Sequence, residues 1–123
     1  MFFGVARLEL LVAQSGSLKE KRAVLHRIRD RLEGRFRISV SEVDHQDLWQ
    51  RAALGVALVA HSEESVRNAL QAVRREVESD PRLWVTEFSI RVEAFAAEDG
   101  DRWGGLDDSG SEAEPPPTRG GRD

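Results

Sequence analysis

The chain has 123 residues, no cysteine and a formal net charge of −4. This length predicts one domain with a single modest core. The lack of cysteine excludes disulfides and thiolate zinc sites, and it suits a reducing compartment. No apolar run reaches the roughly 18 residues of a membrane span, and charges at Arg7 and Glu9 argue against a signal peptide. We therefore expect a cytoplasmic protein that makes no membrane contact.

The charge is divided unevenly along the chain. Residues 17–37 contain eight basic and three acidic side chains, whereas residues 98–123 contain eight acidic and three basic ones. A basic strip of net charge +5 and a tail of net charge −5 therefore offset one another. Gly, Asp, Ser and Pro dominate the tail, and such a composition cannot repay the entropic cost of ordering. We predict a domain over residues 1–96 and an acidic disordered tail over residues 97–123.

The first two elements expected are a strand and a helix. Residues 2–13 alternate between an apolar face and a mixed face, which predicts a strand. Ser17 fits a helix N-cap, because Glu20 three residues later completes a capping box. Lys21 falls within the apolar stripe of this helix, so we expect its stem to pack and its ammonium to reach solvent. We expect Gly34 to end the helix in the left-handed conformation.

Two further strands are predicted next along the chain. Phe36 begins a short alternating strand whose phase slips at Val43, which indicates a bulge near residues 41–42. Residues 52–59 contain no charged side chain, a pattern typical of a strand in the centre of its sheet. The polar connection between the two strands, residues 44–49, is short.

A second helix and a last strand complete the domain. Ser62 is the expected N-cap of the helix, and Pro81 stops it. Residues 84–94 then alternate as a strand. Its even-numbered residues, which include Trp84 and Thr86, are expected to face the core.

The predicted order is therefore β-α-β-β-α-β. The short middle connection indicates an antiparallel hairpin, since parallel neighbours need a long crossover. Right-handed crossovers then give an α+β, ferredoxin-like βαββαβ sandwich, a four-stranded antiparallel sheet with two helices on one face. A small doubly wound parallel sheet is the alternative, and the short connection disfavours it. This fold hosts many functions, so any function must be argued from particular residues.

Three segments also carry a resemblance. The sequences SLKEKR at residues 17–22, FRISV at residues 36–40 and EVDHQDLWQR at residues 42–51 resemble the YlxP-like family of small bacterial proteins, domain of unknown function 503. The similarity covers roughly residues 3–95 and leaves out the tail. The resemblance implies a ferredoxin-like fold and an association with translation and ribosome maturation.

The first candidate site is the basic helix. Exposed basic side chains can follow a phosphate backbone, and the alternative is an ordinary solvated helix face. We expect a noncatalytic binding module without a cofactor, whose partner is RNA or a ribosome-associated protein. The residues predicted to bind nucleic acid are Lys19, Arg22, Arg27, Arg29 and Arg37.

The second candidate site is the polar connection after Val43. An Asp–His pair can orient a general base, and Asp44, His45 and Asp47 together could ligate a metal. No second histidine lies at zinc spacing and no nucleophile motif accompanies the cluster. The alternative is a hairpin in which Asp side chains cap their own backbone and Leu48 and Trp49 fold onto the core. We predict no catalytic or metal-binding residue, and a recognition loop made of Asp44, His45, Asp47 and Trp49.

The third candidate is the sheet face that the helices leave open. Sheet-type RNA readers present aromatic rings on their central strands, whereas this chain presents Ala53, Gly55 and Ala57. The charged residues around them are expected to form cross-strand ion pairs. Such a small, flat patch could pack against another copy. The alternative function is therefore a homodimeric protein-interaction module that uses the open sheet face.

Overall fold

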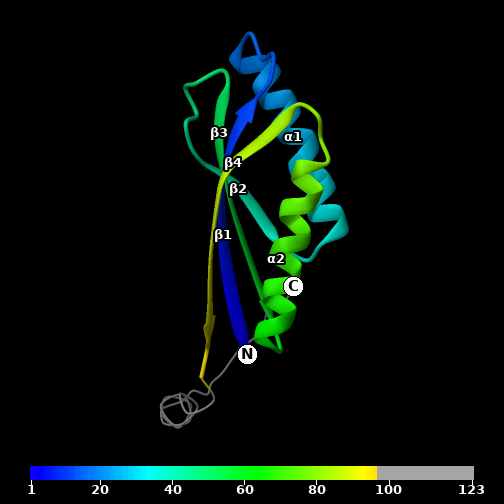
Figure 1. Ribbon diagram of the computed structural model, residues 1–123, viewed down its shortest axis with the longest axis vertical. Helices are drawn as coiled ribbons and strands as arrows, with labels where there is room; N and C mark the ends of the chain where they lie inside the picture. Colours follow the sequence, from blue (N-terminus) through cyan, green and yellow to red (C-terminus); the bar gives the residue numbers. More distant parts are fainter. Residues whose placement is uncertain (97–123) are drawn as a thin grey trace, which may run out of the picture.

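The structure, a computed structural model, describes residues 1–96, which form a twisted sheet with both helices on one face (Figure 1). Its elements are β1 (Phe2–Val12), α1 (Leu18–Arg35), β2 (Ser39–Asp44), β3 (Arg51–Ala60), α2 (Glu63–Glu78) and β4 (Leu83–Ala94). The strand order is β2-β3-β1-β4, and all neighbours are antiparallel. The predicted ferredoxin-like sandwich is confirmed. The predicted tail lies outside the described residues.

Helix α1 begins as its sequence predicts. The Ser17 hydroxyl accepts a hydrogen bond from the Glu20 N–H (3.1 Å), and the Glu20 carboxylate accepts one from the Gly16 N–H (2.7 Å). These bonds satisfy backbone donors that have no partner inside the helix. No helix among residues 1–96 is long and apolar enough to cross a membrane.

The end of α1 differs from the prediction. The helix continues through Gly34 to Arg35, and the chain leaves it through Phe36 in an extended conformation. The Phe36 N–H still donates to the carbonyl of Leu32 (2.9 Å), and its ring packs against the core. An extended exit therefore replaces the left-handed glycine that was expected.

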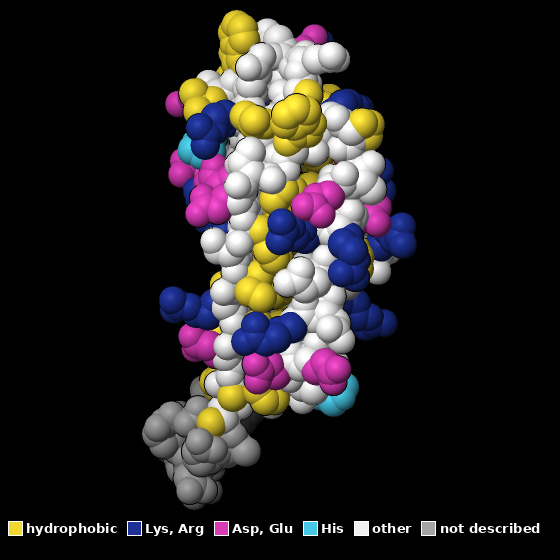
Figure 2. Space-filling model, viewed as in Figure 1, with side chains coloured by type: hydrophobic (Ala, Val, Ile, Leu, Met, Phe, Trp, Pro, Cys, Tyr) yellow, Lys and Arg dark blue, Asp and Glu magenta, His cyan; other side chains and the backbone are white. Residues whose placement is uncertain are grey.

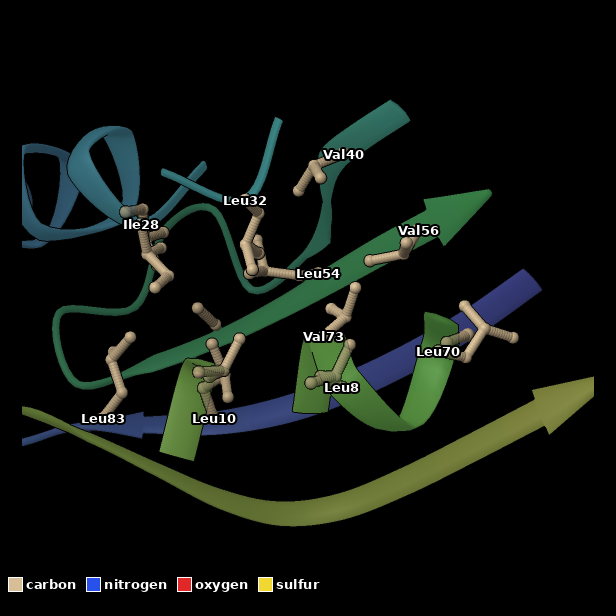
Figure 3. Packing of buried hydrophobic residues seen from close by; sticks show 14 of the residues in the cluster. Leu8, Leu10, Ile28, Leu32, Val40, Leu54, Val56, Leu70, Val73 and Leu83 are labelled. Atoms are coloured by element: carbon tan, nitrogen blue, oxygen red, sulfur yellow. The ribbon is translucent and has the colours of Figure 1, made fainter. Parts of the chain in front are cut away.

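The core fills the space between the helices and the inner sheet face (Figure 3). Every element contributes to it, with fully buried side chains at Leu8, Leu10, Ile28, Leu32, Leu54, Leu70 and Val73. Helix α2 approaches β1 so closely at Gly4 that a Cβ atom there would lie 2.4 Å from Cγ1 of Val66. Only glycine fits at this crossing without movement of the helix.

A bulge in β4 reverses the predicted phase of that strand. The pairing of β1 with β4 shifts by one residue after Glu9, which leaves Thr86 as the extra residue of β4. The Thr86 hydroxyl donates to the Glu9 carbonyl (3.3 Å). Val85 packs on the core, and Trp84 is 62% exposed. The prediction that Trp84 and Thr86 face the core is wrong, because one inserted residue turns the preceding side chains to the opposite face.

A second bulge lies in β2 at Val43, next to the predicted position. The pairing of β2 with β3 shifts between Glu42 and Asp44. The Val43 side chain lies over Gly55 of β3, where a Cβ atom would come within 2.8 Å of Cγ1 of Val43. After the bulge, Asp44 is the last residue of β2 that pairs with β3.

Candidate nucleic-acid interface

A groove of about 560 Å³ lies beside α1, next to β2 and β3. One wall is a row of basic side chains, Lys19, Arg22, His26 and Arg29, separated by three or four residues and therefore on one side of the helix. Leu25 and Leu54 also line the groove, and both are almost completely buried. The groove therefore has a cationic wall and an apolar floor.

The structure brings three of the five predicted basic residues together. Lys19, Arg22 and Arg29 line the groove, and Arg27 and Arg37 do not. Arg37 instead borders a shallow hollow on the sheet, beside Phe3 and Val5. The surface that the sequence presented as one strip is therefore divided between two faces.

Apart from Lys21, the basic residues of residues 17–37 fall into two electrostatic classes. Arg31 and Arg35 form ion pairs with Glu76 of α2, at 3.1 and 3.3 Å. The residues predicted to bind nucleic acid form no ion pair within residues 1–96. They are Lys19, Arg22, Arg27, Arg29 and Arg37. The paired arginines hold the two helices together, which leaves the others available to a ligand.

His26 is a groove residue that the sequence analysis did not select. It lies between Arg22 and Arg29 on the same side of α1, and its Nε2 is 3.2 Å from the Asp30 carboxylate. The sequence feature that could have identified His26 is its spacing, four residues after Arg22 and three before Arg29, which places all three on one side of the helix.

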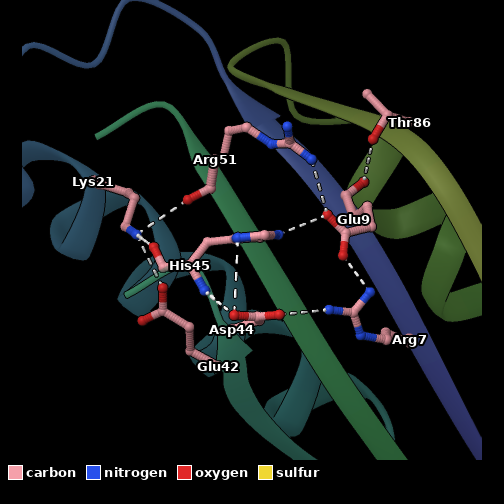
Figure 4. Close-up of polar contacts among 8 residues, drawn as sticks. All are labelled: Arg7, Glu9, Lys21, Glu42, Asp44, His45, Arg51 and Thr86. Atoms are coloured by element: carbon pink, nitrogen blue, oxygen red, sulfur yellow. Dashed lines mark hydrogen bonds and ion pairs between the residues drawn. The ribbon is translucent and has the colours of Figure 1, made fainter. Parts of the chain in front are cut away.

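Lys21 fastens α1 to the hairpin (Figure 4). Its Nζ donates to the carbonyls of His45 (2.7 Å) and Arg51 (3.1 Å), and Glu42 Oε2 lies 3.1 Å away. The side chain has no exposed surface, so the prediction that its ammonium reaches solvent is wrong. An ammonium loses its hydration when it is buried, and here two carbonyls and a carboxylate take the place of the lost water.

His45 occupies a strained position that three contacts maintain. Its φ of 64° is uncommon for a residue with a side chain. Its N–H donates to the Asp44 carboxylate (2.8 Å), its carbonyl accepts from Lys21, and its Nε2 lies 3.0 Å from Glu9 Oε1. Because a carboxylate only accepts, Nε2 carries the proton in this bond. The bond from the His45 N–H means that the Asp44 carboxylate caps the hairpin backbone, as the alternative for this segment predicted.

Glu9 is the acceptor on which this network converges. It is only 7% exposed, although it lies on the open face of the sheet. Arg7 forms an ion pair with it, and Arg51 Nη2 lies 3.3 Å from its Oε1. Burial by itself raises the pKa of Glu9, but the hydrogen bonds from His45 and Arg7 and the charges of both outweigh it, so the pKa falls below its ordinary value. The carboxylate is therefore held ionised by its neighbours.

The other two residues of the predicted recognition loop stand apart from this network. Asp47 and Trp49 border a separate shallow hollow at the hairpin tip. Trp49 is 54% exposed and Leu48 is also exposed, so the alternative in which they fold onto the core is wrong. The tip extends beyond the last paired residues of β2 and β3, where the helices do not cover it (Figure 1). Asp44, His45 and Asp47 do not form a common metal-binding group within residues 1–96.

The open sheet face is less flat than predicted. Ala53 is completely buried and Val43 covers Gly55. Of the three small residues only Ala57 remains exposed, between Val5 of β1 and Ser39 of β2. The ion pairs Arg7–Glu9 and Arg91–Glu93 run along single strands. Two others cross between strands, Glu9 with Arg51 of β3 (3.3 Å) and Arg7 with Asp44 of β2 (3.2 Å).

Comparison with known proteins gives relatives for the fold and the sequence. Residues 3–90 match the model of a family described as protein of unknown function (DUF503). The uncharacterized protein YlxP of Bacillus subtilis (strain 168) is 42% identical over 80 residues, which cover 65% of this chain and 87% of that protein. The solution NMR structure of a de novo designed protein with ferredoxin fold, LFR1 1, matches with a TM-score of 0.51 and 14% identity, covering 79% of this chain and 90% of that one. At that identity the likeness concerns the fold alone.

Proposed function

We propose that this chain, which belongs to the DUF503 family of proteins of unknown function, is a noncatalytic RNA-binding module that holds RNA in the groove beside α1. The observation that supports the proposal is that Lys19, Arg22 and Arg29 line one groove and form no ion pair within residues 1–96. Cations that lack an internal partner gain most from phosphate, because their binding releases the counterions of the nucleic acid.

The dimensions of the groove suit a short stretch of RNA. Lys19 and Arg29 are ten residues apart in the helix, which corresponds to about 15 Å. This length equals about four stacked nucleotides at roughly 3.4 Å each. Glu42 also borders the groove, but it is paired with Lys21. The exposed charge of the wall therefore stays positive.

The hairpin tip supplies the second part of the proposed surface. Lys21 lies in the first turns of α1 and holds the hairpin carbonyls, so the tip is fastened to the helix end that carries Lys19 and Arg22. An exposed tryptophan such as Trp49 offers a ring on which an unpaired base can stack. In this arrangement Asp44 and His45 position the tip, and Trp49 makes the contact.

Charge reversal in the groove tests the proposal. The full chain is titrated against a structured RNA with an unpaired loop, by fluorescence anisotropy at several salt concentrations. We expect Arg22→Glu to weaken binding about tenfold and to reduce the slope of log K against log salt by about 1 or more. The matched control is Arg75→Glu, because Arg75 is an exposed arginine of α2 that forms no ion pair within residues 1–96 and does not line the groove. Binding that ignores salt, or that falls equally in both variants, would contradict the proposal.

A further inference from the structure

Strand β4 is an edge strand of the sheet that residues 1–96 form. It pairs with β1 on one side, and no strand among residues 1–96 lies on its other side. Such an edge offers a row of backbone donors and acceptors for another strand. Residues 87–94 contain neither proline nor lysine, the residues that most often protect an edge, and the bulge at Thr86 comes before them.

We propose that a second copy of the chain pairs with this edge, antiparallel, with Ser89 of both copies at the two-fold axis. The two sheets then continue as one, and the same surface serves both partners, as a two-fold interface requires. This register places Glu87 of each copy opposite Arg91 of the other.

Charge complementarity selects this register. Glu87 is exposed and forms no ion pair within residues 1–96, and the contact of Arg91 is a loose one, with Glu93 at 3.9 Å. Pairing about Ser89 creates two cross-strand Glu–Arg pairs, which stabilise antiparallel strands. An axis at Ile90 would place Glu87 against Glu93, two like charges. An axis at Phe88 would leave Glu87 opposite Ser89.

The side of β4 that faces the helices carries an incompletely covered apolar row. Phe88, Ile90 and Val92 pack against the core and are only partly buried. Figure 2 shows hydrophobic side chains in a column along the molecule, with Lys and Arg side chains beside it. In the proposed pairing, Phe88 of one copy lies opposite Ile90 of the second copy. The apolar row thereby gains cover that the single chain does not provide.

The charges of α2 that are placed near this row do not oppose the approach of a second copy. The Arg74 guanidinium lies over the Phe88 ring, 4.9 Å from its centroid. Arg74 is also paired with Glu78 (3.1 Å), and Arg67 with Glu63 (2.9 Å). Each of these pairs is neutral, so the paired charges of α2 add no net repulsion between two copies.

A single cysteine tests the two-fold axis directly, since the full chain has none of its own. Directly opposed residues of antiparallel strands have Cα atoms about 4.5–5.5 Å apart, within the range of a disulfide. We expect Ser89→Cys to form a disulfide-linked dimer under mild oxidation. The control is Ser41→Cys, because Ser41 is an exposed serine on β2, the opposite edge. A monomeric Ser89→Cys protein, or equal cross-linking of both variants, overturns the proposal.

Charge exchange tests the register by sedimentation. We expect a concentration-dependent dimer of the wild-type chain, about tenfold weaker dimerisation in Glu87→Arg or Arg91→Glu, and recovery in the double variant E87R/R91E. Both side chains are exposed, so the fold is expected to persist, and circular dichroism verifies it. Ala57→Arg on the open face should leave the dimer intact. A wild type that stays monomeric at every concentration overturns the proposal, as does a dimer that Ala57→Arg abolishes and Arg91→Glu does not.

Discussion

The ammonium of Lys21 lies 2.7 Å from the carbonyl oxygen of His45, and this bond joins the first helix to the hairpin between β2 and β3. The two residues are 24 positions apart in the chain. The same ammonium reaches Arg51 at the start of β3, so one side chain fixes both ends of the connection. The helix that lines the proposed RNA-binding groove is therefore joined to the base of the hairpin through one side chain.

Removal of the Lys21 charge should destabilise the domain. Lys21→Met keeps most of the apolar stem but removes the ammonium from the Glu42 carboxylate and from the carbonyls of His45 and Arg51. The His45 carbonyl then keeps only the Leu48 N–H (3.1 Å). We expect a loss of about 3 kcal/mol in the free energy of unfolding, measured by urea titration. Lys19→Met is the control, because Lys19 is exposed, and it should change stability by less than about 0.5 kcal/mol. Equal stability of the two variants would contradict a structural role for Lys21.

Glu9 should make stability depend on pH in the acidic range. Its pKa in the folded chain lies below the ordinary value of 4.5, so the unfolded chain binds a proton first as the pH falls. Its contribution is therefore complete above about pH 4.5 and is lost as the pH drops through the lowered pKa. We expect Glu9→Gln to be less stable at neutral pH and to lose less stability on acidification, as measured by thermal melting from neutral to acidic pH.

Asp80 also makes stability depend on acidic pH, so Glu9→Gln can remove only part of that dependence. The hydrogen bond from Arg82 lowers the pKa of Asp80, against the effect of burial, and the Arg82 and Arg31 charges lower it further. Some acid sensitivity should therefore persist in Glu9→Gln. A variant with the full pH dependence of the wild type would show that Glu9 does not carry the effect.

Two glycine substitutions should have opposite effects. Gly4→Ala places a methyl group 2.4 Å from Cγ1 of Val66, so α2 must shift. We expect a loss of about 1–3 kcal/mol, as for other overpacked sites. Gly34 lies inside α1 with nothing within 4 Å of its position, so Gly34→Ala should add about 0.5–1 kcal/mol. Urea titration of both variants checks the pair, and a stabilising Gly4→Ala would refute the close crossing.

The acidic segment after residue 97 should compete with RNA for the basic groove. Its net charge of −5 is opposite to that of residues 17–37. We expect a chain that ends at Ala96 to bind RNA more tightly than the full chain, with the largest difference at low salt, where exposed charges are least screened. A full-length chain with the acidic residues of this segment changed to amides should behave like the shortened one. Equal affinity of all three would reject competition.

The elements themselves could be predicted because their signals are local. Ser17 and Glu20 are three residues apart and cap α1 as expected. The short connection before β3 was sufficient to indicate an antiparallel hairpin, and right-handed crossovers then led to the ferredoxin-like sandwich. The phase of β4 could not be predicted in the same way. The bulge at Thr86 exists only in relation to the register with β1, so the direction of Trp84 depends on a strand more than 70 residues away in the chain.

The candidate site likewise has features that the local sequence predicts and features that depend on the tertiary structure. The row Lys19, Arg22 and Arg29 follows from helical spacing, and the sequence by itself determined that it exists and is basic. Only the tertiary structure decides which basic side chains lack an ion pair within residues 1–96, because Arg31 and Arg35 pair with Glu76 of α2.

Lys21 and Glu9 show the physical reason most clearly. Lys21 lies in the apolar stripe of α1 and Glu9 on the mixed face of β1. Both are buried as charged groups, because most of their partners lie 21 to 42 residues away in the chain and meet them only after folding. Local patterns indicate which segments form helices and strands, although β2 begins at Ser39 and not at Phe36 as predicted. Whether a charged side chain is buried or exposed depends on which distant donors and acceptors surround it, and only the tertiary structure decides which groups these are.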